Sequence, residues 1–230
     1  MSLKTDADEI TLIADPKVLA IPIHENNEPM VDLKNQTILV FGTSPEVPNN
    51  TNYTKMRKTV YEKLVQAQSL LPTGIRFCLY EAYRSLELQK KLFDERYNKV
   101  KKAHATWTHE AIFHETIKLV SPIINLDNSI NIPPHATGAA IDVYLLDAAG
   151  KPLDMGMHPQ DWVEDQQGEL SKTEATCIPQ EARHNRQLMS HALEQVGFAN
   201  YPTEFWHWSY GDRYWAYQTG ANVAVYGMMK

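Results

Sequence analysis

The first fifty residues carry short apolar stretches that Pro and Asn interrupt. Residues 10–13, 18–23 and 37–41 have the length of strands, and they predict strands joined by loops. Residues 47–52, V-P-N-N-T-N, show no apolar periodicity and predict a further loop. This N-terminal part is expected to be looser than the rest of the chain.

A helical pattern follows from Thr54, which can cap a helix N-terminus. The residues that recur at helical spacing are Val60, Leu64, Ala67 and Leu71. Pro72 and Gly74 end this pattern, and the apolar residues 75–80 predict a strand. Ser85 can cap the next helix. The residues on its apolar face are Leu88, Leu92 and Tyr97.

The second half of the chain continues this mixture of helices and strands. Thr108 can cap a helix that ends near Val120, and residues 139–146 alternate as a strand. Residues 181–196 form an amphipathic helical pattern, and the aromatic residues 205–210 predict a strand. Because helices and strands are intermixed without a regular β-α-β-α order, the pattern favours an α+β fold over a doubly wound sheet.

Composition and charge exclude several classes of protein. The 230 residues, of which 43% are hydrophobic and 22% charged, are typical of one soluble globular domain. A net charge of −6 argues against a nucleic-acid partner. No apolar run is long enough for a membrane span. The start lacks an apolar leader, so we expect a cytoplasmic protein, or a periplasmic one if a leader was removed. Cys78 and Cys177 give no disulfide framework.

An acidic residue in an apolar strand is the first sign of chemistry. Asp142 lies in the middle of the predicted strand 139–146, where its buried charge needs a partner. On the alternation of a strand it shares a face with Gly138 and Ala140, whose small side chains leave room beside it. His135, seven residues earlier, is a candidate partner. This environment suits a metal and a small substrate close to the backbone.

A second polar pair lies in the aromatic strand. Glu204 and His207 suit a general base beside a metal ligand. Together, His135, Asp142 and His207 would give zinc three protein ligands and an open fourth position, as in catalytic sites. In a regular strand, however, residues three apart point to opposite faces. A bulge, or the turn after Pro202, is therefore required to bring Glu204 to the metal side.

The spacings alone are weak signals. With 9 His and 28 acids in the chain, any fixed His-to-acid offset is expected about once by chance. His158 and Asp165 repeat the first offset, and Glu181 and His184 repeat the second. Both repeats are interpreted as structural or solvated pairs. The alternative for the main residues is a buried His–Asp hydrogen bond with an aromatic strand packed on the core.

Three motifs in this order resemble a known family. Residues 134–142, P-H-A-T-G-A-A-I-D, are similar to the pattern S-x-H-x-x-G-x-A-x-D, and residues 204–207, E-F-W-H, match E-x-W-H. The Y-R-S turn at residues 83–85 follows a strand. Together they resemble the D-alanyl-D-alanine dipeptidase family of zinc peptidases, which is related to peptidoglycan D,D-carboxypeptidases and to the hedgehog-like fold. The resemblance covers roughly residues 75–210.

The resemblance implies both a fold and a set of roles. The fold would be a single domain over residues 1–230, with a mainly antiparallel central sheet and flanking helices. One zinc ion per chain would be bound by His135, Asp142 and His207. Glu204 would take the proton of a metal-bound water and pass one to the leaving amine. Arg84 would hydrogen-bond the developing oxyanion, the alternative for this residue being a local salt bridge with Glu81.

The implied reaction is hydrolysis of D-Ala-D-Ala or a related dipeptide, and two departures from the pattern bear on substrate preference. Pro133 and Pro134 replace serines before the first zinc histidine. Where the family places the acid that holds the substrate ammonium, this chain has Gln160 and Asp161, of which only Asp161 carries a charge.

Two other functions stay open at this stage. One is a peptidoglycan D,D- or L,D-carboxypeptidase, which uses the same chemistry on a longer substrate. The other is a catalytically silent, zinc-bearing binding module. Glu204 and Arg84 argue against the silent module, because a structural zinc site needs neither. The sequence does not fix the stereochemical preference or the oligomeric state.

Overall fold

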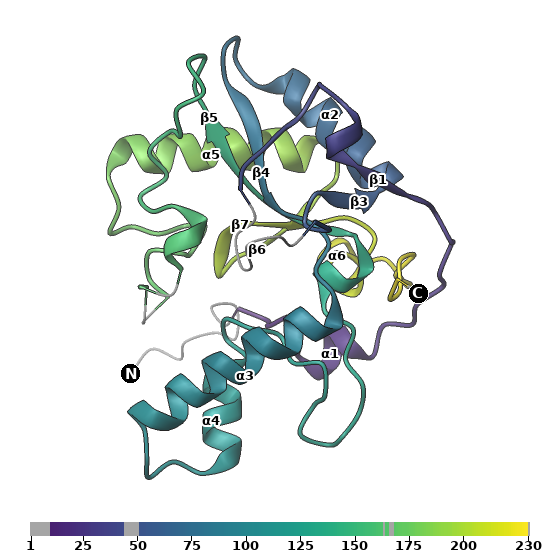
Figure 1. Cartoon of the computed structure of the whole chain (residues 1–230), viewed down its shortest axis with the longest axis vertical. Helices are drawn as coiled ribbons and strands as arrows, with labels where there is room; N and C mark the ends of the chain where they lie inside the picture. The colour runs from purple at the N-terminus through teal and green to yellow at the C-terminus, as the bar shows by residue number, and fades with distance from the viewer. Residues whose placement is uncertain (1–9, 44–50, 163, 166–167, 230) are drawn as a thin grey trace, which may run out of the picture.

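The computed structural model describes residues 10–43, 51–162, 164–165 and 168–229, and its centre is a five-stranded sheet (Figure 1). The strand order is β2-β4-β5-β7-β6. The strands are β2 (Val40–Phe41), β4 (Arg76–Glu81), β5 (Ala140–Leu146), β6 (Ala199–Tyr201) and β7 (Glu204–Ser209). Only the β2–β4 pair is parallel among these described strands. The predicted α+β class with a mainly antiparallel sheet is confirmed.

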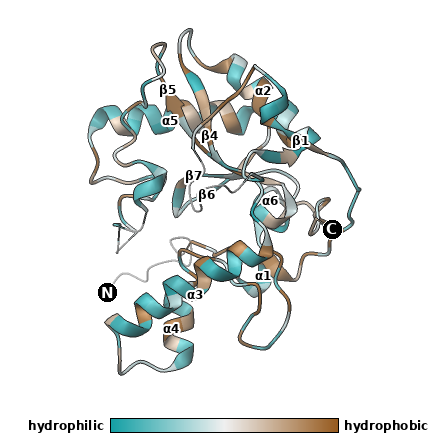
Figure 2. Cartoon of the chain, in the orientation of Figure 1, coloured by the Kyte–Doolittle hydropathy of each residue, from teal (hydrophilic) through white to brown (hydrophobic). Residues whose placement is uncertain are grey.

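The main hydrophobic core lies between one face of this sheet and two long helices, α2 (Lys58–Leu70) and α5 (Gln180–Gln195). Because β5 alternates, Ile141, Val143 and Leu145 all point into this core and are fully buried. The predicted helical face of α2 packs against them through Val60, Leu64 and Ala67. Figure 2 shows the apolar colour along β4 and β5.

The opposite face of the sheet carries Asp142 and a smaller apolar cluster of Cys78, Tyr80, Tyr144 and Leu146. Helices α3 (Leu86–Ala103) and α4 (His109–Thr116) pack on each other, apart from α2 and α5 (Figure 1). As predicted, Ser85 and Thr108 cap them by accepting hydrogen bonds from the backbone N–H groups of Leu88 and Ala111.

Among the described helices, none is long and apolar enough to cross a membrane.

The N-terminal part corrects several predicted elements. Residues 10–13 form no strand, and residues 18–23 overlap the short helix α1 (Pro16–Leu19) instead of a strand. Asp15 caps this helix, and Pro16 fits its first turn because the missing N–H would have no partner there. Of residues 37–41, only Val40–Phe41 is a strand. Most of the loop predicted at residues 47–52 lies outside the described residues.

The start of the first long helix is also corrected. Thr54 does not cap it, because strand β3 (Lys55–Arg57) intervenes and pairs with β1 (Met30–Asp32) in a separate two-stranded sheet. Further on, α4 ends at Thr116, before the predicted Val120. Among the short elements that were not predicted at all are β1, β3, β6 and the helix α6 (Arg213–Thr219) that follows β7.

Candidate active site

The register of the β5–β7 ladder places two of the predicted ligands side by side. Asp142 on β5 lies directly opposite His207 on β7. Because the strands are antiparallel and the side chains alternate, opposed residues project to the same face. The His207 Nδ1 atom lies 3.0 Å from Asp142 Oδ1. The partner that the buried charge of Asp142 requires is therefore supplied by the neighbouring strand.

A break in the β6–β7 ladder brings Glu204 to the same side as His207. The ladder runs regularly from Ala199 opposite Ser209 to Asn200 opposite Trp208, and then places Tyr201 opposite Glu204. Asn200 spans this irregularity by donating to the backbone carbonyls of Glu204 and His207. Such a bulge re-aims the side chains around it. The geometric requirement seen in the sequence is met, and Glu204 Oε2 lies 3.9 Å from His207 Nδ1.

His135 comes from the short 3₁₀ turn η3 (Pro134–Thr137), just before β5. Gly138 ends this turn with a φ of 72°, where a Cβ atom would lie 2.6 Å from the Met30 sulfur. Glycine is thus required by both the backbone conformation and the close approach of Met30. This turn directs the His135 ring back over β5, where its Nε2 atom lies 3.4 Å from Asp142 Oδ2.

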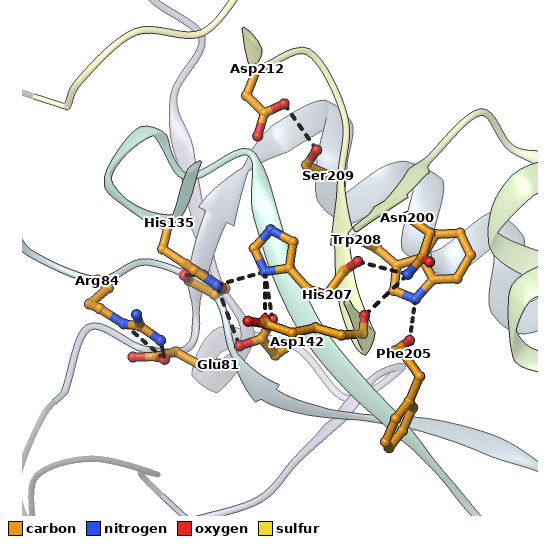
Figure 3. A network of polar contacts seen from close by, with 12 residues as sticks. Glu81, Arg84, His135, Asp142, Asn200, Phe205, His207, Trp208, Ser209 and Asp212 are labelled. Carbon is orange, nitrogen blue, oxygen red and sulfur yellow. Dashed lines mark hydrogen bonds and ion pairs between the residues drawn. The ribbon is translucent and has the colours of Figure 1, made fainter. Parts of the chain in front are cut away.

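The three predicted ligands form one buried cluster (Figure 3). One ligand atom from each of His135, Asp142 and His207 lies within 4.8 Å of the others. The two facing ring nitrogens, His135 Nε2 and His207 Nδ1, are 3.2 Å apart. All three residues are at most 5% exposed. Two imidazole nitrogens and one carboxylate oxygen converging at this scale suit a zinc ion with an open fourth position.

A backbone hydrogen bond fixes the tautomer of His135. Its Nδ1 lies 2.6 Å from the carbonyl oxygen of Ala82, which can only accept. The proton is therefore on Nδ1, and the lone pair of Nε2 faces the cluster. The backbone N–H of Arg84 in turn donates to the His135 carbonyl. The histidine is held on both sides by the segment that follows β4.

The electrostatics of the cluster favour an ionised Asp142. Burial opposes its charge, but the hydrogen bonds and positive potential of His135 and His207 hold its pKa well below the usual range. Burial lowers the pKa of His207, but Asp142, Glu204 and Asp212 together raise it more, so the net direction is upward. Asp142 is thus ionised under ordinary conditions, as a carboxylate metal ligand would need to be.

Glu204 has the electrostatic environment of a proton carrier. Burial raises its pKa to about 7, with Asp142 adding to the rise, while His207 and Arg84 oppose it. A carboxyl group with a pKa near neutrality exchanges protons readily in either direction. Its side chain is 14% exposed, so it reaches the cavity next to the ligand cluster.

Arg84 is held at the edge of the site by two buried side chains. Its guanidinium forms an ion pair with Glu81, which is fully buried, and its Nη1 donates to Gln89 Oε1 over 3.0 Å. Gln89 is itself fixed by donating to the Ser121 carbonyl. The local salt bridge considered from the sequence is present, and Arg84 also lines the cavity. The β4–β5 ladder is irregular between Leu79 and Glu81, next to this ion pair.

All five predicted site residues line one cavity of about 70 Å³. Its apolar wall is formed by Leu92, Leu119, Val120, Trp162 and Trp206. Pro133 and Pro134 also line it. Among the described lining residues the acids are Asp142 and Glu204. Asp161 is half-buried at the end of η4 (Pro159–Asp161) and is not part of this lining, although its neighbour Trp162 is.

The repeated spacings do not form second sites. Glu181 and His184 are exposed on α5. His158 packs edge-on against Tyr144, with ring centroids 4.6 Å apart. Among the described residues, the cluster around Asp142 is the only group of three or more such side chains that could hold a metal. Gln89 and Tyr201 also line the cavity and were not predicted, because neither a polar side chain on a helix nor an aromatic residue in a strand signals a site.

The sequence model of the D-Ala-D-Ala dipeptidase family matches residues 46–225, which include every site residue described above. The chain belongs to this family. It is similar to a D-alanyl-D-alanine dipeptidase of Synechocystis sp. (strain ATCC 27184 / PCC 6803 / Kazusa). The two are 25% identical over 250 residues, which cover 92% of this chain and 96% of the relative.

Solved structures of more distant peptidases are also similar to this member of the D-Ala-D-Ala dipeptidase family. VanYB in complex with D-alanine-D-alanine is 16% identical, with 83% of this chain and 91% of that chain covered and a TM-score of 0.42. The L,D-carboxypeptidase LdcB is 15% identical, with 96% and 89% covered and a TM-score of 0.36.

Membership of the D-Ala-D-Ala dipeptidase family makes the chain a metallopeptidase and confirms the predicted family and enzyme class. The roles of the individual residues stay predictions, which the geometry supports in distinct ways. It brings His135, Asp142 and His207 into one metal-sized cluster. It places Glu204 beside that cluster and Arg84 on the same cavity.

Proposed function

We propose that this chain hydrolyses the peptide bond of D-Ala-D-Ala or a closely related dipeptide, with one zinc ion per chain. The observation that carries the proposal is the convergence of a buried His–Asp–His cluster, a carboxyl group and an arginine on one small cavity. A structural metal site would need no base and no arginine. The volume of about 70 Å³ has room for several water molecules, so the cavity favours a small substrate.

The donor set fits zinc. His135 Nε2, Asp142 and His207 Nδ1 would hold it, since each of these donor groups faces the cluster. When bound, such an ion acts as a Lewis acid toward the scissile carbonyl and makes water a better nucleophile near neutral pH. With one carboxylate among three ligands, the site keeps a net positive charge, which supports both effects.

The chain's own residues would handle the protons and the developing charge. Glu204 would accept the proton of the attacking water and later deliver a proton to the leaving amine, as a pKa near 7 permits. Arg84 would donate hydrogen bonds to the carbonyl oxygen as it becomes negative. Because Glu81 and Gln89 hold the guanidinium in advance, little reorganisation is required during the reaction.

The metal assignment predicts about one zinc per chain in protein purified without chelator. Chelation should abolish hydrolysis of D-Ala-D-Ala, and added zinc should restore it. Asp142→Asn should lose stoichiometric zinc, whereas His158→Gln, at the repeated spacing, should retain it. Elemental analysis and activity assays measure both quantities. Full hydrolysis by metal-free protein would contradict the proposal.

The dipeptide assignment predicts that free D-Ala-D-Ala is a better substrate than its N-acetylated form. N-acetylation removes the charge of the substrate ammonium and adds bulk to a ligand that must fit a small cavity of about 70 Å³. We expect kcat/KM for the free dipeptide to exceed that for the acetylated one by about 10- to 100-fold. This is the scale of one hydrogen bond to a charged group.

The comparison of the two peptides also tests the carboxypeptidase alternative. Equal values, or a preference for the blocked peptide or for a D-Ala-D-Ala-ended pentapeptide, would favour a carboxypeptidase. The variant Asp161→Asn tests the acid suggested by the sequence. If Asp161 holds the ammonium when substrate is bound, this variant raises KM for the free dipeptide far more than it lowers kcat.

A further inference from the structure

A buried carboxyl group, Asp212, lies just beyond the strand that carries His207. It is 2% exposed and is the N-cap residue of α6. Its Oδ1 atom accepts two hydrogen bonds, from the Trp215 backbone N–H at 2.7 Å and from the Ser209 hydroxyl at 2.9 Å. Capping therefore uses only one of the two carboxyl oxygens.

The second oxygen of Asp212 and the outer nitrogen of His207 are both unsatisfied. Asp212 Oδ2 and His207 Nε2 are buried, and neither has a hydrogen-bond partner within the described part of the chain. Figure 3 shows the His207 ring with one nitrogen toward Asp142 and the other turned toward Ser209 and Asp212. Ser209 is two residues beyond His207 on β7, so both side chains lie on the same face.

Asp212 also lines a small cavity, whose lining does not include His207. It has a volume of about 10 Å³, which is close to the minimum for one water molecule. Its lining includes Asp212, Thr137 and Asn131, and Asn131 Oδ1 is a further buried atom that lacks a partner among the described residues. Polar partners and sufficient room are the two conditions for a buried water to be retained.

We propose that Asp212 is a positioning residue for the metal centre, acting on His207 through its free carboxyl oxygen, directly or through a buried water. An imidazole that binds a metal through Nδ1 carries its proton on Nε2, and this N–H needs an acceptor. The carboxylate supplies one, either directly or through the water. It thereby fixes the ring orientation and the tautomer of His207 and increases the basicity of Nδ1.

This inference deepens the proposed function, because it requires that His207 is a metal ligand. It gives His207 the same arrangement that the Ala82 carbonyl gives His135, with one ring nitrogen held by the protein and the other facing the cluster. It also accounts for a buried acid whose second oxygen does not contribute to the cap. A residue with only a capping role would need one acceptor atom.

The test compares Asp212→Asn with a matched control. Asparagine keeps the oxygen that caps α6, because Asn and Asp are equally good N-caps, but it replaces Oδ2 with a donor. Asp32→Asn is the control, since Asp32 Oδ1 also accepts from one backbone N–H, that of Lys34, and one hydroxyl, that of Thr54. Asp212→Ser provides a second variant that retains a capping oxygen and removes the carboxylate.

Zinc affinity is measured by competition with a chromogenic chelator, and the thermal midpoint is measured on metal-free protein. We expect Asp212→Asn and Asp212→Ser to weaken zinc binding by about 10- to 100-fold. Asp32→Asn should leave it unchanged. The visible spectrum of the cobalt-substituted protein should shift in the Asp212 variants only, because the geometry of a ligand changes. The metal-free proteins of Asp212→Asn and Asp32→Asn should both stay folded, because each asparagine keeps its capping oxygen.

The proposal is overturned if both Asp212 variants bind zinc within about twofold of the unaltered chain. It is also overturned if their weaker binding accompanies a loss of the folded metal-free protein that Asp32→Asn does not show, since the role would then be structural. Because zinc affinity is measured without substrate, these outcomes are independent of which peptide is hydrolysed. Failure of the unaltered chain to bind zinc would instead contradict the proposed function itself.

Discussion

Replacing Glu204 with Gln is expected to lower kcat for D-Ala-D-Ala by about 10²-fold or more while zinc stays bound. The amide keeps the shape of the side chain but cannot accept the proton of the attacking water. Glu204 lies 3.9 Å from His207 Nδ1, on the same cavity as the ligand cluster. The variant therefore removes the proton acceptor and leaves His135, Asp142 and His207 intact. Steady-state kinetics and elemental analysis of the same preparation measure both effects.

Glu181→Gln is the matched control, because Glu181 and His184 repeat the Glu204–His207 spacing on the exposed side of α5. This control should change kcat by less than about twofold. Near-full activity of Glu204→Gln would show that the base lies elsewhere. Loss of zinc from Glu204→Gln would show that the carboxyl group contributes to metal binding, which also contradicts the assigned role.

Arg84→Lys is expected to lower kcat by about 10²-fold, on the scale of removing one oxyanion donor. Lysine keeps a positive charge opposite Glu81, so the buried carboxyl group is not left without a cation. Lysine lacks the planar guanidinium with which Arg84 contacts both Glu81 and Gln89. Its hydrogen-bond donors therefore have no fixed direction. KM should change less than kcat, because the hydrogen bond strengthens as charge develops.

The alternative role of Arg84, as a salt bridge only, predicts a different result. The thermal midpoint of Arg84→Lys would then fall while kcat stayed within about twofold. Glu81→Gln separates the two roles further, since it removes the anion and retains the guanidinium. It should cost less kcat than Arg84→Lys if the arginine contacts the substrate, and the same amount or more if the ion pair is what matters.

The sequence predicted which side chains meet at this site better than it predicted how the fold brings them together. A carboxylate in an apolar strand demanded a partner, and the ladder supplies His207 directly opposite Asp142. The helix caps at Ser85 and Thr108 were predictable because a hydroxyl next to free backbone N–H groups is a local signal. The irregularity that turns Glu204 toward the metal side depends on pairing with β6, so only its necessity could be inferred.

Where the prediction was wrong, the pattern was short and the decisive contact was distant. The apolar residues 18–23 resemble a strand, yet Asp15 and Pro16 begin a helix there, whose Val18 packs against Tyr201 and Tyr214. Periodicity cannot distinguish the two in so short a run. Gln89 gave no signal as a site residue, because its role depends on where Arg84 lies in three dimensions.

The pairing of Asp142 with His207 has a consequence for folding. These two residues are 65 positions apart in the sequence, and His135 is 53 positions from the Ala82 carbonyl that orients it. No local segment can therefore assemble the ligand set before β5 has paired with β4 and β7. Contacts this distant form late, because loop closure must come first. A metal that binds only the completed sheet would slow unfolding more than it accelerates folding.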